Sequence, residues 1–172
     1  MSGFSLFRGA LALAALLAPS LTHAAPVSPT RNATATVEIA TSATIRKIED
    51  LNFAMLTVTT AGPAVVNPNT DTMTTTGGVI HAGGVPYAAL FEAISPSKNV
   101  VIIRIPRIPT TVTRVGGTET MRVDTWTLSG SANRNVVARE PFQFKIGGTL
   151  HVNTNQAEGT YLGTFLVEIQ FP

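Results

Sequence analysis

The sequence contains no cysteine among its 172 residues, so disulfide bonds, thiol catalysis and thiolate metal sites are excluded. Charged residues make up 13% of the chain and aromatic residues 6%. The formal charge of +2 gives no basis for a nucleic-acid partner. The abundant residue is threonine, with 25 copies, together with 14 glycines and 11 prolines. This composition favours β-strands joined by turns.

Recognisable catalytic motifs are also missing from the sequence. It has no Gly-x-Ser-x-Gly nucleophile turn, no His-Glu-x-x-His zinc motif, no phosphate-binding loop and no EF-hand loop. His81 and His151 are 70 residues apart, and no third metal ligand is evident near either. We therefore expect no enzymatic activity, no metal and no cofactor. An enzyme with an unrecognised site is the weakest of the alternatives that stay open.

The N-terminus has the layout of a secretory signal peptide. A short apolar run at residues 11–18 follows a single cation, Arg8, and leads to small residues at 21–25. Cleavage after Ala24 fits this pattern best, so residues 1–24 are predicted to be the signal peptide. The apolar run is too short to span a bilayer, because a transmembrane helix needs about 20 apolar residues. We expect an exported mature chain without a membrane span.

Hydrophobic and polar residues alternate from residue 33 to residue 45. A period-two pattern predicts β-strand, and this one is longer than a usual single strand. We divide it near residues 40–42, which gives an N-terminal extension at residues 25–40 and a domain at residues 41–172. The extension presents one face as an extended strand, made of Ala33, Ala35, Val37 and Ile39.

Further short strands are predicted along the domain, and residues 61–71 are predicted to be a turn-rich connection because of their Gly, Pro, Asn and Asp content. Residues 85–95 are compatible with either a helix or a strand, since their apolar residues have helical spacing over only a short length. Several short strands at regular spacing predict an immunoglobulin-like antiparallel β-sandwich. The predicted strands are residues 51–59, 79–82, 99–105, 119–128, 141–146, 149–152 and 161–171.

The last predicted strand has a wholly apolar face, with its residues set two apart. The penultimate residue of the chain is aromatic, and Gly159 is the 14th residue from the end. In these features the chain resembles subunits of chaperone-usher pili, whose C-terminal strand has the same plan. The residues of this face are Phe165, Val167, Ile169 and Phe171.

More of the chain resembles the archaic, spore coat protein U type of these subunits. The matching features are the alternating N-terminal strand, the run Asp50-Leu51-Asn52-Phe53, and Gly-Thr-Tyr at residues 159–161. The chain is still more similar to an uncharacterised family of secreted, cysteine-free, pilin-like domains. That similarity includes the Gly-Gly-rich middle and Gly147-Gly148-Thr149-Leu150.

The resemblance implies a sandwich that lacks one strand and is completed by a donor strand. A periplasmic chaperone would first occupy the gap beside residues 165–171, and residues 33–39 of a neighbouring subunit would then replace it, with Val37 and Ile39 as anchors. The implied function is a structural subunit of a bacterial surface fimbria or surface layer, assembled with an outer-membrane usher. The main alternative is a self-complemented, monomeric, secreted β-sandwich that binds a ligand such as a glycan through its loops.

Overall fold

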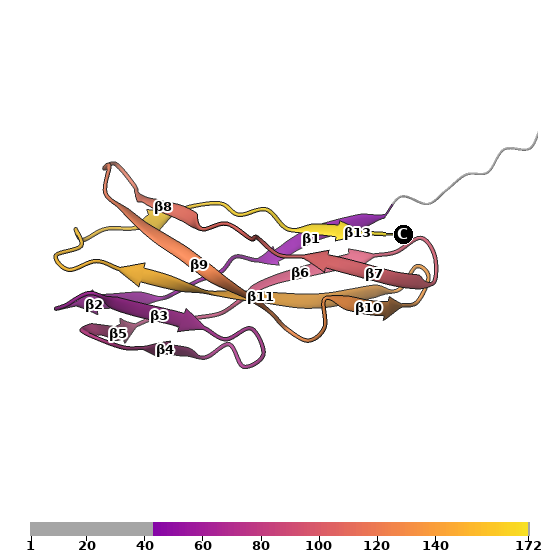
Figure 1. The fold of residues 1–172 in the computed structure, drawn as a ribbon, viewed down its shortest axis with the longest axis horizontal. Helices are drawn as coiled ribbons and strands as arrows, with labels where there is room; N and C mark the ends of the chain where they lie inside the picture. Colours follow the sequence, from indigo (N-terminus) through magenta and orange to yellow (C-terminus); the bar gives the residue numbers. More distant parts are fainter. Residues whose placement is uncertain (1–42, 172) are drawn as a thin grey trace, which may run out of the picture. The chain divides into compact units, whose positions relative to one another are not determined.

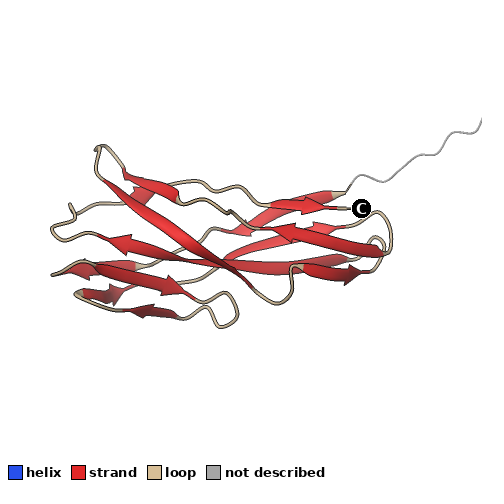
Figure 2. Cartoon of the chain, viewed as in Figure 1, coloured by secondary structure: helices blue, strands red, loops and turns tan. Residues whose placement is uncertain are grey.

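The computed structural model describes residues 43–171, and every regular element in this range is a β-strand (Figures 1 and 2). The strand pairings among these residues are all antiparallel. No segment of this range forms a helix that is long and apolar enough to cross a membrane. The prediction of an all-β, antiparallel sandwich is confirmed. The strands are β1 (Thr44–Glu49), β2 (Met55–Val58), β3 (Gly62–Val66), β4 (Met73–Thr75), β5 (Val79–Gly83), β6 (Ala89–Ile94), β7 (Asn99–Arg104), β8 (Thr110–Arg114), β9 (Thr120–Leu128), β10 (Asn133–Val136), β11 (Pro141–Val152), β12 (Tyr161–Leu162) and β13 (Glu168–Gln170).

The largest sheet is organised around β11, which runs through the middle of Figure 1. The strand order of this sheet is β1-β6-β11-β9-β8-β12, and β3 and β4 extend it beside β11. One edge of β11 pairs with β6 through residues 141–146 and then with β3 through residues 148–152. This is possible because β11 has 12 residues, about twice the usual strand length. Two smaller sheets, β10-β7-β13 and β2-β5, complete the fold.

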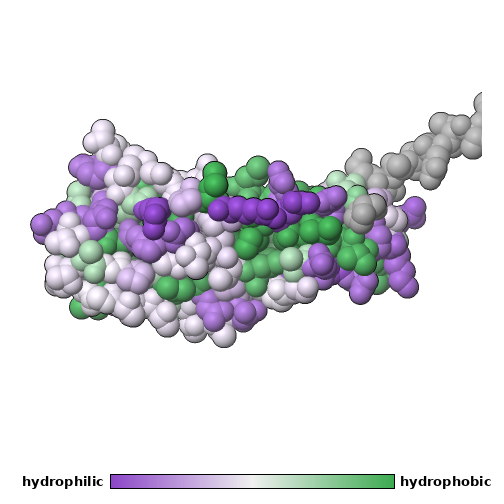
Figure 3. Space-filling model, in the orientation of Figure 1, coloured by the Kyte–Doolittle hydropathy of each residue, from purple (hydrophilic) through white to green (hydrophobic). Residues whose placement is uncertain are grey.

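One end of the sandwich has an aromatic core between the main sheet and the β10-β7-β13 sheet. Phe91 of β6 and Phe144 of β11 stack with their ring centroids 5.4 Å apart. Eight more hydrophobic residues pack against this core and stay partly exposed. Figure 3 shows hydrophobic residues at the surface in the half of its face that contains β7 and β13. The buried members of this core are Ala89, Phe91, Ala93, Ile103, Phe144 and Ile146.

At the other end the main sheet curls into a half-barrel around a second core. β5 lies against β3 and β4, so the β2-β5 sheet contributes to the same core. Trp126 of β9 contacts both cores and is partly buried by each of them. The two cores therefore meet at Trp126. The buried members of the second core are Ala64, Val79, Val123, Leu150 and Val152.

Trp126 reaches the interior because β9 contains a β-bulge. The pairing register against β11 shifts in this part of the strand, and Thr125 has a φ of 48°. In a regular strand Val123 and Trp126, three residues apart, would point to opposite faces. The extra residue of the bulge turns both toward the core. Gly148 of β11 leaves space for the indole, since a Cβ at this position would lie 3.2 Å from the ring.

Three segments differ from the sequence expectations or resolve them. Residues 85–95 contain strand β6, so the strand interpretation of this segment is confirmed. Residues 61–71 were predicted as a connection, which is wrong for residues 62–66, because β3 forms there and buries Ala64 and Val66 completely, whereas residues 67–71 do form a turn. Residues 141–152 form one continuous strand where two were predicted. The Gly147-Gly148 pair marks close packing inside β11, since a Cβ at Gly147 would overlap the carbonyl oxygen of Val66.

Candidate functional site

An apolar groove of about 2180 Å³ opens between the half-barrel and the C-terminal segment. One wall is formed by residues 50–58, which include β2. The other wall is formed by the β7–β8 connection, β8, and residues 156–166. The floor is formed by β9 and β11 together with the core-facing side chains of β2 and β8. The groove is thus bounded by segments from both ends of the described chain.

The floor of the groove is the uncovered side of the second core. Its residues belong to the hydrophobic cluster inside the half-barrel, and most of them are only partly buried. A core that stays open along one side leaves apolar surface exposed to water, which is unfavourable by about 25 cal/mol for each Å². The floor residues are Leu56, Val58, Val112, Met121, Val123, Trp126, Leu150 and Val152.

The rim of the groove is also apolar. Five large hydrophobic residues that line it are between 64% and 75% exposed. Large exposed apolar surfaces on soluble proteins mark interaction sites, whereas single exposed hydrophobic residues are common. The combination of an apolar floor and an apolar rim therefore indicates a docking surface. The rim residues are Met55, Val85, Ile108, Leu162 and Leu166.

The backbone along the groove has unpaired edges. Residues 163–167 lie between β12 and β13 and take part in no sheet pairing and no backbone hydrogen bond among the described residues. On the opposite wall, β2 pairs only with β5 within this part of the chain, so its other edge is open. An unpaired strand edge is a template for the addition of another strand.

The C-terminal residues singled out from the sequence lie on one face of the chain. Phe165, Val167 and Ile169 pack against the aromatic core, and the residues between them are exposed. Phe165 also contacts Trp126, with ring centroids 4.5 Å apart. Phe171 is half-buried.

Only part of this predicted set reaches the groove. Of the C-terminal residues named from the sequence, Gly159 and Phe165 line it. Gly159 has a φ of 143°, a conformation almost restricted to glycine, and a Cβ there would lie 3.0 Å from Cδ of Arg114. The predicted donor residues Ala33, Ala35, Val37 and Ile39 lie outside the described residues.

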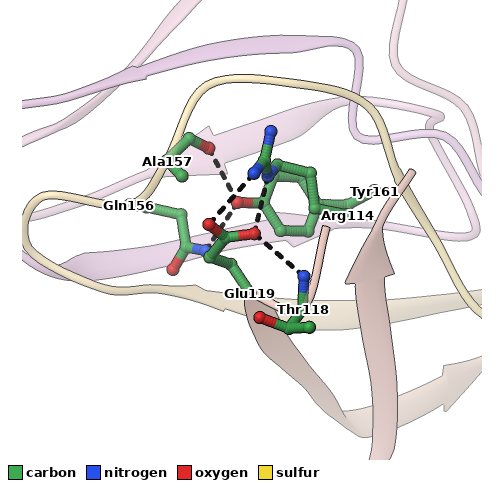
Figure 4. A network of polar contacts seen from close by, with 6 residues as sticks. All are labelled: Arg114, Thr118, Glu119, Gln156, Ala157 and Tyr161. Atoms are coloured by element: carbon green, nitrogen blue, oxygen red, sulfur yellow. Dashed lines mark hydrogen bonds and ion pairs between the residues drawn. The ribbon is translucent and has the colours of Figure 1, made fainter. Parts of the chain in front are cut away.

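A polar network holds the end of the groove where the C-terminal segment begins (Figure 4). The Arg114 guanidinium donates to both carboxylate oxygens of Glu119, at 2.7 and 3.0 Å. The Tyr161 hydroxyl donates to the carbonyl oxygen of Ala157 and accepts from the amide of Gln156, each at 2.7 Å. Because Arg114 and Tyr161 are paired between β8 and β12, the network fixes the start of the C-terminal segment against β8.

This network predicts an acid-dependent loss of stability. The hydrogen bond from Arg114 lowers the pKa of Glu119 from 4.5 to about 2. A lowered pKa in the folded state stabilises the fold above pH 4.5, and that contribution is lost as the pH falls toward about 2. We expect thermal unfolding, followed by circular dichroism, to show a smaller drop in melting temperature over this range for Glu119→Gln than for the wild type.

The matched control for this pH experiment is Glu140→Gln. Glu140 is exposed and has no ion pair among the described residues. Its replacement should leave the pH dependence of the melting temperature unchanged. Parallel pH curves for Glu119→Gln and the wild type would show that the Arg114–Glu119 pair does not stabilise the fold.

The outer face of the half-barrel carries a separate charged cluster. Nε2 of His151 lies 2.7 Å from one carboxylate oxygen of Asp124, and Arg122 lies 2.8 Å from the other. The hydrogen bond with His151 lowers the pKa of Asp124. Among residues 43–171 no group of three or more His, Cys, Asp or Glu side chains is placed to hold a metal ion. The contact between His151 and Asp124 links β11 to β9 across the sheet surface.

Comparison with known proteins adds one family. Residues 43–171 match DUF4402, a domain of unknown function. The chain belongs to the DUF4402 family. No curated protein and no solved structure matches the chain.

The DUF4402 domain contains the whole groove. Its match begins one residue before β1 and ends one residue after β13. Residues 33–39, the donor strand predicted from the sequence, precede the DUF4402 match. The domain and the predicted donor strand are thus separate parts of the chain.

Several groove residues were not identified from the sequence. Strand β8 was not predicted, although Val112 lies between threonines in a period-two pattern. Trp126 was placed on a predicted strand, but the bulge that turns it inward has no simple sequence signal. The β2 wall was predicted as a strand, and alternation alone could have assigned Leu56 and Val58 to its inner face.

Proposed function

We propose that the protein is a structural subunit of a bacterial surface fimbria or a related surface layer. Copies assemble when residues 33–39 of one copy, the donor segment, add as a β-strand in the groove of the next copy. The observation that carries this proposal is the groove itself, which combines an open apolar core with the unpaired backbone of residues 163–167. Strand addition satisfies both, since main-chain hydrogen bonds give affinity and alternate side chains fill the apolar floor.

The size of the groove supports an extended chain as its occupant. Small-molecule sites have volumes of about 300–1,000 Å³ and bury most of the ligand. This groove measures about 2180 Å³ and is lined by residues from seven strands and five connecting segments. A segment of polypeptide would fill a space of this size better than a compact ligand.

The donor segment has the pattern that the groove requires. Its residues alternate between a small or aliphatic face and a polar face. In an extended strand one face would therefore point to the apolar floor and the other to solvent. Val37 and Ile39 are its largest aliphatic residues and would supply most of the buried area, since a fully buried aliphatic side chain contributes about 1.5–3 kcal/mol.

The direction of β1 favours a donor segment from a second copy. The C-terminal end of β1 leads directly to Asp50 and Leu51, which line the groove. Residues 33–39 precede the other end of β1, so they would have to reverse direction to reach the groove of their own domain. The intervening residues 40–43 are Ala-Thr-Ser-Ala and contain no Gly, Pro, Asn or Asp. Two-residue turns between antiparallel strands rely on Gly, Asn or Asp.

A subunit with an open groove would need assembly factors that protect the groove until a neighbour fills it. A subunit whose core is uncovered risks non-specific edge-to-edge pairing before it meets a neighbour. A periplasmic chaperone that lends a strand to residues 163–167 would protect this edge in transit, and an outer-membrane usher would direct the exchange. The predicted signal peptide at residues 1–24 supports export, with the periplasm as an intermediate stage and the cell surface as the destination.

Deletion of residues 25–40, with the signal peptide kept, tests this function. The variant has a groove but no donor segment, so we expect it to form no polymer by itself. Mixed with wild-type subunits, it should accept a strand and donate none, and thus shorten the polymers. Electron microscopy and sedimentation of material sheared from the cell surface measure both effects.

The same experiment separates the two main functions. A self-complemented monomer would leave the wild type monomeric and would make the deletion variant unstable, with no effect on mixed samples. If the deletion variant is by itself a soluble, well-folded monomer without a chaperone, the donor segment completes neither its own domain nor a neighbour, and the proposal is wrong.

A further inference from the structure

We infer that Arg107 on the rim of the groove binds Glu38 of the incoming donor segment and thereby sets the register of the strand. This inference rests on the proposed function. The groove has an apolar floor, and five charged residues line its walls and rim beside the apolar rim residues. The charged residues are Asp50, Arg104, Arg107, Glu158 and Glu168.

One of the two cations that line the groove already has a partner. Arg104 donates a hydrogen bond to the side-chain oxygen of Gln170 at 2.7 Å, and it is paired in register with Glu168. Arg107, in contrast, is exposed and makes no ion pair or side-chain hydrogen bond within residues 43–171. Arg107 is thus the cation on these walls that is available to an incoming strand.

The backbone around Arg107 is held next to Trp126 of the groove floor. It lies in the short β7–β8 connection between Pro106 and Pro109, and each proline restricts the backbone. Nε1 of Trp126 donates to the carbonyl oxygen of Ile108 at 3.3 Å, which ties this connection to the floor. Trp126 also contacts Phe165 and packs against both cores. Arg107, which precedes Ile108, therefore lies near the place where the two cores meet.

The donor segment carries one charged residue, and the alternation puts this residue on the face that would point to the rim, where Arg107 lies. Glu38 lies between Val37 and Ile39. When these two aliphatic side chains point to the floor, alternation directs Glu38 outward to the rim. A carboxylate and a guanidinium form a directional, often bidentate pair. The pair would thus place Val37 and Ile39 on either side of Trp126 on the floor of the groove.

The charge pair is needed because the apolar floor alone does not define the register of the donor segment. The hydrophobic residues of the floor come from several strands, and a slip of two residues would keep the same face of the donor segment inward. Such a slip would move Val37 and Ile39 away from their positions and put Ala35 in the place of Val37. A single charge pair disfavours this alternative, since Glu38 would then lie about 7 Å from its partner.

Intermolecular cross-linking tests the inference, because the chain has no native cysteine. Chains with Glu38→Cys and chains with Arg107→Cys are assembled together and oxidised. We expect a reducible heterodimer on electrophoresis. Two control pairs should give at most a tenth of this yield: Thr34→Cys with Arg107→Cys, which uses the same outward face four residues earlier, and Glu38→Cys with Glu158→Cys, which uses another unpaired rim residue.

Charge reversal gives a second readout. Glu38→Arg and Arg107→Glu should each slow assembly about two- to five-fold, the range for a rim ion pair, and the combined variant should recover. The inference is wrong if assembly proceeds but Glu38→Cys links to Glu158→Cys as efficiently, or if the combined variant does not recover. The proposed function itself fails if the wild type does not assemble, or if a chain with both Glu38→Cys and Arg107→Cys forms the link within a monomer.

Discussion

Replacing both Val37 and Ile39 with aspartate is expected to abolish polymer formation and to leave the chaperone-bound subunit folded. Two buried aliphatic side chains contribute about 3–6 kcal/mol to the docked strand, which corresponds to a factor of roughly 100 or more in affinity. The two carboxylates would in addition lie unpaired against the apolar floor of the groove, and burial of unpaired charge is strongly unfavourable. Sedimentation velocity of the exported protein measures the loss of polymer.

The matched control carries the same charges on the other face of the donor segment. Thr34→Asp with Thr36→Asp places both carboxylates toward solvent, so assembly should persist. An aspartate double variant at Val37 and Ile39 that unfolds the monomer would show that this segment completes its own domain. If that variant still polymerises, the groove is not the docking site.

The strands with strong alternation could be predicted from the sequence, and those with small residues could not. Strand β7 was expected from its β-branched pattern and is present at the predicted place. Strand β6 was ambiguous because two of its three buried residues are alanines, Ala89 and Ala93, which add little to a hydrophobic pattern. Its identity as a strand follows from its position between β1 and β11, which is a long-range property.

Glycine had different roles in turns and in strands, and the sequence does not distinguish them. Gly77 has a φ of 70° and lies in the turn before β5, as its position in a Gly-Gly pair indicated. Gly147 and Gly148 also form a Gly-Gly pair, yet they lie inside β11, where Val66 of β3 and Trp126 of β9 leave no room for a side chain. Only the packing of β3 and Trp126 against β11 explains why glycine is required at these two positions.

The C-terminal strand was predicted as continuous over residues 161–171 with the correct face, and the resemblance implied an open edge beside residues 165–171. In the structure residues 168–170 pair with β7, and the open edge is at residues 163–167. Phe165, Val167 and Ile169 do face the core, as their spacing indicated. The pattern, however, is the same for a strand with two neighbours and for one with none. That residues 163–167 are unpaired depends on where β8 and β7 end, and this is determined by the whole sheet.

Replacing Phe144 with alanine is expected to destabilise the domain by about 3–5 kcal/mol, the range for loss of a buried aromatic side chain. Phe144 is 2% exposed and stacks on Phe91. Its ring also lies 5.8 Å from the guanidinium carbon of Arg134, whose NH1 donates to the carbonyl oxygen of Gln143 at 2.8 Å. The substitution would therefore leave a cavity and expose a partly buried cation. Because native domains are stable by only about 5–15 kcal/mol, the change removes a large part of the total.

The same substitution at Phe142 is the matched control. Phe142 lies two residues earlier on the same face of β11, with its ring centroid 6.4 Å from that of Phe144, but it is only partly buried. The free energy of unfolding is measured with urea, on protein without chaperone or with a donor strand in its groove. Phe142→Ala should lower it by less than half as much as Phe144→Ala, since less apolar area returns to water. Equal losses would mean that the aromatic core is no better packed at its centre than at its margin. The open side of the sandwich would then extend from the groove into this core, and a donor strand would have to cover both.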